Sequence, residues 1–168
     1  MLTEELKQLQ APLKEKYRNE PAAAMITLKA EGNLGEGISC KVATGKAIVE
    51  AGLHPATGGN GMLACSGDML LEALVACAGV TMNAVATAIN IEIKSGTVKA
   101  EGDLDFRGTL GVSKEAPVGF KEIRLMYHID CNASPEELAS LMKLTERYCV
   151  VYQTLKNGAS MNASVQII

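Results

Sequence analysis

The most reactive side chains of this sequence are its five cysteines, Cys40, Cys65, Cys77, Cys131 and Cys149. Their odd number and irregular spacing argue against the disulfide framework of a secreted protein. No basic segment followed by an apolar one stands at the N-terminus, so we expect no secretion leader. We therefore expect a cytoplasmic protein, because a reducing compartment lets unpaired thiols persist.

Histidine and glycine motifs do not support a second kind of site. His128 and Cys131 are three residues apart at the end of an expected strand, so their side chains point to opposite faces. The segment 59–64 matches a dinucleotide-binding fingerprint in its letters, but no buried strand precedes it and no βαβ unit follows. The sequence thus predicts no metal site, no cofactor and no histidine-based nucleophile relay.

Cys77 and Cys149 lie in the two segments with the strongest helical patterns. A rotation of about 100° per residue places Leu70, Leu74 and Thr81 on the face of the first helix that carries Cys77. Cys149 continues the apolar face of the second helix. Spacing alone favours a packing role for these thiols and makes neither of them reactive, since free cysteine is among the most buried residue types.

The helix that carries Cys77 is expected to begin near Ser66 and to be unusually apolar. Its only charged residues up to position 90 are Asp68 and Glu72, in the first two turns, where carboxylates suit the positive end of the helix dipole. Its polar residues and many alanines favour a buried core helix over a membrane span. A helix that is apolar all round must be covered all round, and an intertwined homodimer would supply that cover in a chain with 4% aromatic residues.

Shorter patterns on both sides of this helix indicate one domain of class α+β. Residues 1–20 form an amphipathic accessory helix, and residues 21–168 form the domain. Ser134 and Glu137 form a capping-box pattern at the start of the second helix. Alternating or β-rich runs predict strands at residues 25–30, 38–42, 47–49, 97–106, 122–129 and 160–168, with loops at 51–67 and 108–119.

Composition excludes nucleic acid as a partner. The net charge is -3, the four arginines are scattered, and aromatic residues make up only 4% of the chain. A nucleic-acid site needs a basic surface, and single strands also need aromatic stacking platforms. We expect neither a nucleic-acid partner nor a membrane partner.

Two segments together resemble the OsmC/Ohr family of thiol-dependent peroxidases. They are residues 66–77, with the sequence SGDMLLEALVAC, and residues 147–151, with the sequence RYCVV. The resemblance covers roughly residues 25–168, and the N-terminal helix is an addition to it. It implies an OsmC-like α+β fold in which antiparallel sheets wrap around a long buried central helix, and an intertwined homodimer.

The resemblance also implies a role for each thiol. Cys77 corresponds to the peroxidatic cysteine, whose thiolate attacks an organic hydroperoxide, releases an alcohol and becomes a sulfenic acid. Cys149 corresponds to the resolving cysteine, which forms a Cys77–Cys149 disulfide that an external dithiol reduces. An apolar pocket with Leu70, Leu74 and Thr81 beside Cys77 would favour a small hydrophobic hydroperoxide.

The sequence departs from the family at the charged groups of the site. The family pairs an arginine from the N-terminal β region with a glutamate near the start of the long helix. Here Asp68 stands in the place of the acid, and no arginine occurs between Arg18 and Arg107. The lysines that remain as substitutes are Lys29, Lys41 and Lys46. Without a nearby cation, an apolar environment should raise the pKa of Cys77 and slow its attack.

A different class of function is compatible with the same residues. In this alternative the protein is a non-catalytic dimeric OsmC-like protein that binds a small hydrophobic or sulfur-containing ligand in the apolar pocket beside Cys77. The thiols would then serve packing or ligand contact. A low pKa of Cys77 favours the enzyme, and a raised pKa favours the binding protein.

Overall fold

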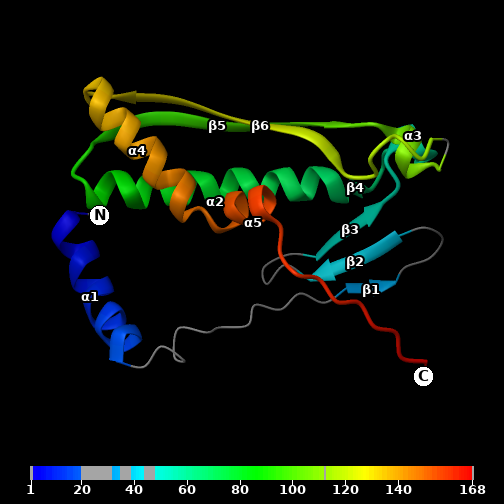
Figure 1. Ribbon diagram of the computed structural model, residues 1–168, viewed down its shortest axis with the longest axis horizontal. Coiled ribbons are helices and arrows are strands. Elements are labelled where there is room, and N and C mark those ends of the chain that lie inside the picture. The colour runs from blue at the N-terminus through cyan, green and yellow to red at the C-terminus, as the bar shows by residue number, and fades with distance from the viewer. Residues whose placement is uncertain (1, 20–31, 35–38, 44–47, 112, 168) are drawn as a thin grey trace.

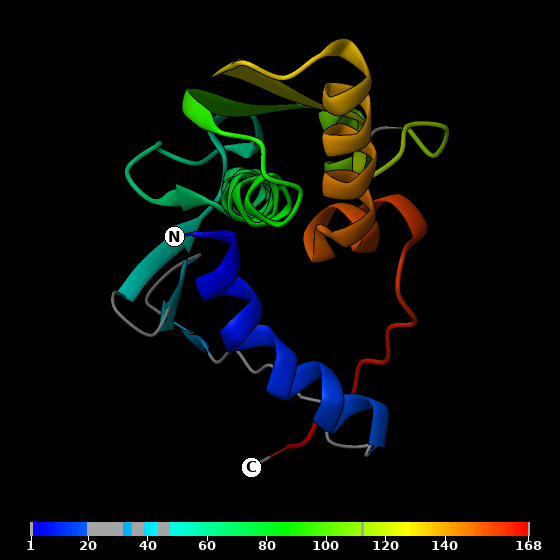
Figure 2. The same cartoon turned by 90° about the vertical axis from the view of Figure 1, so that its left-hand side faces the viewer.

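The computed structural model describes residues 2–19, 32–34, 39–43, 48–111 and 113–167. Its central element is helix α2 (Ser66–Ala88), which packs against a long β-hairpin and, on an adjacent face, against helices α4 (Pro135–Tyr148) and α5 (Val150–Asn157) (Figures 1 and 2). Helix α2 begins where the sequence predicts. Its buried residues lie along the packed side of the helix and are Leu74, Ala78, Met82, Val85 and Ala86.

The hairpin consists of β5 (Ile93–Leu104) and β6 (Phe120–Cys131), which pair antiparallel with Val98 opposite Tyr127. Side chains alternate along both strands, because successive residues of a strand point to opposite faces. Helix α2 packs against the hairpin at Gly79, where an added Cβ atom would lie 3.7 Å from Val98 Cγ2. The strands expected at 97–106 and 122–129 are therefore confirmed, although Phe106 begins the short helix α3 (Phe106–Thr109) instead.

Helix α4 (Pro135–Tyr148) starts at the capping box that the sequence predicts. The Glu137 backbone N–H donates to Ser134 Oγ at 3.3 Å, and the Ser134 N–H donates to the Glu137 carboxylate at 2.7 Å. Each bond satisfies a donor that the first turn of a helix leaves free. Leu141 of α4 is fully buried against Met82 and its neighbours on α2, which forms the core between the two helices.

The second sheet leads the chain into α2. Its strands are β1 (Gly32–Leu34), β2 (Ser39–Ala43), β3 (Ile48–Gly52) and β4 (Ala64–Cys65), in that order across the sheet. A 3-10 turn, η2 (Pro55–Thr57), and β4 interrupt the segment that the sequence predicts as one loop. The strand expected at residues 25–30 lies outside the described residues.

The N-terminal helix α1 (Thr3–Asn19) meets the rest of the chain at the C-terminal end of α2. The Thr3 hydroxyl donates to the Thr87 carbonyl at 3.0 Å, and α1 then runs away from α2 (Figures 1 and 2). Its start and end agree with the sequence-based expectation.

Within the described residues, helix α2 is packed along one side and Val80 on its other side is 72% exposed, so the single chain does not cover the helix all round. The strand expected at residues 160–168 is wrong for the single chain. Residues 160–167 form no strand and are exposed, because a strand needs a neighbouring backbone to accept and donate its hydrogen bonds. Helix α2 is also long and apolar enough to cross a membrane, and 28% of its most apolar 18-residue stretch is buried. Core helices of soluble proteins can have the same length and hydropathy.

Candidate active site

The fold brings Cys77 and Cys149 together. Cys77 lies near the middle of α2, and Cys149 lies at the junction between α4 and helix α5 (Val150–Asn157). The Cys149 thiol donates a hydrogen bond to the Cys77 sulfur. Cys149 is fully buried, whereas Cys77 is half-buried and therefore the more accessible of the two.

The N-terminus of helix α5 lies at the Cys77 sulfur. The first N–H groups of a helix have no partner within the helix, and the end that they form carries partial positive charge. Here the backbone N–H groups of Val150 and Val151 donate to Cys77. The Thr81 hydroxyl, one turn along α2, donates as well. We call these donors, together with the Cys149 thiol, the thiolate cradle.

The pKa of Cys77 is lowered, whereas the sequence predicts a raised pKa. Burial on its own would raise this pKa, but the donors from Val151, Cys149, Thr81 and Val150 together hold it below its usual value. None of these four groups is cationic. Hydrogen bonds to the charged form stabilise a thiolate as a neighbouring cation does.

The second thiol shows the opposite shift. Burial raises the pKa of Cys149, and the Cys77 sulfur beside it raises the pKa further as an acceptor and as a negative charge. The two shifts act in opposite directions, so Cys77 is the thiol of the pair that ionises more readily and Cys149 is the one that keeps its proton longer. This order makes Cys77 the better candidate for the attacking nucleophile.

Thr81 offers a direct test of the cradle. A Thr81→Val variant keeps the shape of the side chain but loses the donor, so we expect the pKa of Cys77 to rise by about one unit, the equivalent of one modest hydrogen bond. The pH dependence of Cys77 alkylation by iodoacetamide measures this shift. A Thr87→Val variant is a matched control on the same helix, because the Thr87 hydroxyl donates to the Asn83 carbonyl instead. Equal pKa values in the wild type and Thr81→Val would contradict the cradle.

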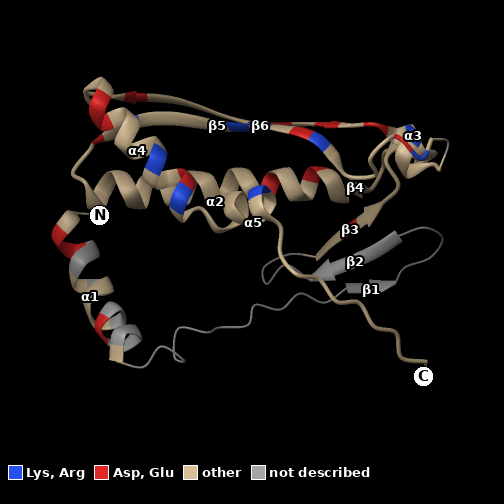
Figure 3. Ribbon diagram, in the orientation of Figure 1, with Lys and Arg blue, Asp and Glu red and all other residues tan. Residues whose placement is uncertain are grey.

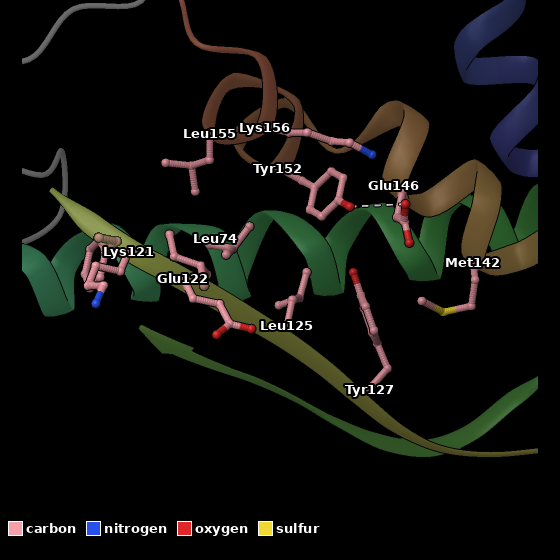
Figure 4. A pocket seen from close by; sticks show the side chains of 12 residues that line it. Leu74, Lys121, Glu122, Leu125, Tyr127, Met142, Glu146, Tyr152, Leu155 and Lys156 are labelled. Carbon is pink, nitrogen blue, oxygen red and sulfur yellow. Dashed lines mark hydrogen bonds between the residues drawn. The ribbon is translucent and has the colours of Figure 1, made fainter. Parts of the chain in front are cut away.

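A cavity of about 440 Å³ lies between α2, β6 and the two C-terminal helices (Figure 4). Leu74, three residues before Cys77, lines it, and the Tyr152 hydroxyl donates to the Glu146 carboxylate at 3.2 Å on its rim. Two lysines, Lys121 and Lys156, also lie at the cavity. The remaining lining residues are mostly apolar: Phe120, Ile123, Leu125, Met142 and Leu155, with Tyr127 and Glu122.

The other candidate residues lie in different surroundings. Leu70 is 38% exposed and does not line the cavity. Asp68 is exposed in the first turn of α2, beside Leu71, so the single chain does not bring it to Cys77. Asp68 and Glu72 are the only charged residues on α2 (Figure 3). The side chains of the three candidate lysines and of Cys40 lie outside the described part of the chain.

Helix α5 is the functional element that the sequence analysis missed. Two β-branched residues follow Cys149 and obscure the helical pattern, because such residues favour strands. The signal that could have revealed the helix stands at its end. Lys156 lies in the last turn, and Gly158 takes a positive φ of 69° directly after the helix.

The described residues thus combine an α+β fold with two thiols held at the N-terminus of a helix. A model of the family described as OsmC-like protein matches residues 59–164. The chain therefore belongs to the OsmC-like protein family, and the resemblance seen in the sequence is confirmed. A search of curated proteins found no match.

Solved structures agree on the fold. The OsmC-like protein from Mycoplasma pneumoniae is 20% identical, with a TM-score of 0.66 over 79% of this chain and 89% of that one. An organic hydroperoxide resistance protein from Elizabethkingia anophelis is 18% identical, with a TM-score of 0.64 over 80% and 91%. The organic hydroperoxide resistance protein OhrB of Bacillus subtilis is 16% identical, with a TM-score of 0.55 over 80% and 94%. At these identities the likeness concerns the fold.

Proposed function

We propose that this protein is a thiol-dependent peroxidase that reduces organic hydroperoxides to alcohols. The observation that carries the proposal is the pair formed by Cys77, whose pKa is lowered, and Cys149, whose pKa is raised, in hydrogen-bonding contact. A thiol peroxidase needs one thiolate to attack and a second thiol within disulfide reach. Fold relatives described as organic hydroperoxide resistance proteins support the same chemistry.

The first step is attack by the Cys77 thiolate on the outer oxygen of the hydroperoxide, R–O–OH. The S–O bond forms as the O–O bond breaks, so that Cys77 becomes a sulfenic acid, S–OH, and an alkoxide, RO⁻, leaves. The alkoxide takes up one proton to become the alcohol. Two electrons pass from sulfur to the peroxide, which balances the reduction.

The second step becomes possible because the first step removes the negative charge of the Cys77 thiolate. Once Cys77 is a neutral sulfenic acid, the negative charge that raises the pKa of Cys149 is gone. The N–H groups of Val151 and Tyr152, which lower the pKa of Cys149, then favour its thiolate. Cys149 attacks the Cys77 sulfur, the disulfide forms, and water leaves with the proton of Cys149. An external dithiol then reduces the disulfide and is itself oxidised to a disulfide.

The cavity beside α2 supports a small hydrophobic hydroperoxide as the substrate. Its apolar lining, Leu74 and Leu125 included, removes hydrocarbon from water at about 25 cal/mol per Å². Hydrogen peroxide has no hydrocarbon to bury and gains nothing from this surface. The expected compartment remains a reducing cytoplasm, where an external dithiol is available.

Steady-state peroxide consumption tests the proposal. With dithiothreitol as the dithiol, the wild type should consume cumene hydroperoxide catalytically and prefer it over hydrogen peroxide in kcat/KM. Absence of turnover with either peroxide would overturn the peroxidase. Saturable binding of cumyl alcohol without turnover would then support the binding protein as the alternative.

We also propose that the protein is a homodimer. The uncovered side of α2 presents the apolar residues Ala73, Ala76, Val80 and Ala84 to solvent, and the C-terminal residues Met161, Val165 and Ile167 are each more than nine-tenths exposed. A second copy of the chain would cover the first surface and provide a strand edge for the second.

Light scattering of the full chain should give the mass of two chains. A Val80→Lys variant should shift the mass to one chain, because it places a charge in the middle of the covered surface. Val118→Lys is a matched control, since Val118 is 66% exposed on the loop between β5 and β6. A wild-type mass of one chain at micromolar concentration would contradict the homodimer.

A further inference from the structure

The hydroxyl of Tyr127 is buried and has no hydrogen-bond partner among the described residues. A buried hydroxyl without a partner destabilises the fold and calls for an explanation. The Thr145 hydroxyl shares this property, but it does not line the cavity. Tyr127 does line it, and Figure 4 shows its ring extending from β6 toward α2.

Tyr127 lies at the level of Cys77 along α2. It packs against the core cluster that contains Met82, five residues after Cys77, and it shares the cavity with Leu74, three residues before Cys77. In their ionised forms, Cys149 and Cys77 both raise the pKa of the phenol, so the two thiols lie near it. Tyr127 therefore lies beside both the cavity and the part of α2 that carries Cys77.

Among the described residues, the donors around the Cys77 sulfur are already engaged. The N–H groups of Val150 and Val151 and the Thr81 hydroxyl are engaged with the Cys77 sulfur. The Tyr152 hydroxyl is engaged with Glu146. An alkoxide that leaves into the cavity needs a hydrogen-bond donor, and the hydroxyl of Tyr127 is not engaged with any described residue.

We propose that Tyr127 is a catalytic residue that donates its hydroxyl proton to the leaving oxygen of the hydroperoxide. This inference rests on the proposed peroxidase function. As Cys77 forms its S–O bond and the O–O bond breaks, the Tyr127 proton passes to RO⁻, which gives ROH and a phenolate. The phenolate recovers a proton from solvent before the next turnover.

The protonation state of Tyr127 suits this role. Burial, followed by the negative charges that Cys149, Glu146, Tyr152 and Cys77 carry at the alkaline pH where the phenol titrates, raises the pKa of Tyr127 to about 12. The phenol is thus protonated at neutral pH. An alkoxide is still the stronger base, so the transfer runs toward the alcohol.

A leaving-group comparison tests the inference. In single-turnover oxidation of Cys77, a Tyr127→Phe variant should react about 10- to 100-fold more slowly with tert-butyl hydroperoxide, whose alkoxide needs the proton. With peracetic acid the loss should be less than about threefold, because carboxylate leaves without a proton. Tyr148→Phe, at a 59% exposed position outside the cavity, should react as the wild type does with both.

Two further measurements separate the possible failures. Alkylation of Cys77 by iodoacetamide needs no proton donor, so its rate should be unchanged in a folded Tyr127→Phe variant. Equal losses with both peroxides, or no loss with either, would overturn the role of Tyr127 while leaving the peroxidase intact. A wild type that tert-butyl hydroperoxide and peracetic acid both fail to oxidise at Cys77 would instead overturn the proposed function, and the role of Tyr127 with it.

Discussion

A Cys77→Ser variant is expected to consume cumene hydroperoxide no faster than the uncatalysed reaction. The cradle of Val150, Val151 and Thr81 lowers the pKa of a thiol, but no such set of hydrogen bonds makes a serine hydroxyl ionise near neutral pH. Oxygen is also a far weaker nucleophile than a thiolate toward peroxide oxygen. Initial rates of peroxide loss under dithiothreitol measure the effect.

The substitution changes one half-buried atom, so the fold is expected to persist. Cys131→Ser is the matched control, because Cys131 is also half-buried but lies at the end of β6, opposite Ile93. Cys131→Ser should keep the wild-type rate. Residual catalysis in Cys77→Ser, or an equal loss in Cys131→Ser, would show that Cys77 is not the attacking residue.

A Cys149→Ser variant is expected to complete one oxidation and then stop. The serine hydroxyl still donates to the Cys77 sulfur, so the thiolate survives and the first step proceeds. The sulfenic acid then has no resolving thiol and is oxidised further to sulfinic acid, which dithiols do not reduce. Turnover should therefore fall to near the background after one equivalent of peroxide.

Mass spectrometry of the intact variant distinguishes these states. Cys149→Ser should gain one oxygen atom with stoichiometric peroxide and two or three oxygen atoms with excess peroxide. The wild type should instead lose two hydrogen atoms as the disulfide forms. Sustained turnover by Cys149→Ser would show that an external thiol resolves Cys77 directly and that Cys149 serves packing.

Local signals in the sequence predicted the elements that position the thiols. The absence of charge after Glu72 predicted α2, and the capping box at Ser134 predicted α4, because both depend on neighbouring residues only. The prediction of a strand at residues 160–168 was wrong because a strand depends on residues that are distant in the chain. Its alternation is real, but pairing depends on a partner backbone that the single chain does not supply.

The environment of Cys77 could not be predicted from the sequence. Its backbone donors come from residues 150 and 151, more than seventy positions away in the chain, and only the packing of α2 against α5 brings them to the sulfur. The absence of a nearby arginine in the sequence therefore predicts a raised pKa of Cys77, which is wrong. Backbone N–H groups occur at nearly every residue, so no composition or spacing marks the ones that reach a thiol.

The most direct measurement is disulfide mapping after one equivalent of cumene hydroperoxide. Peptides of the non-reduced wild type, analysed by mass spectrometry, should contain a Cys77–Cys149 link within the same chain, and dithiothreitol should remove it. Cys65 and Cys131 should stay free thiols. A Cys77 that remains unmodified with no link to Cys149 would contradict the peroxidase mechanism.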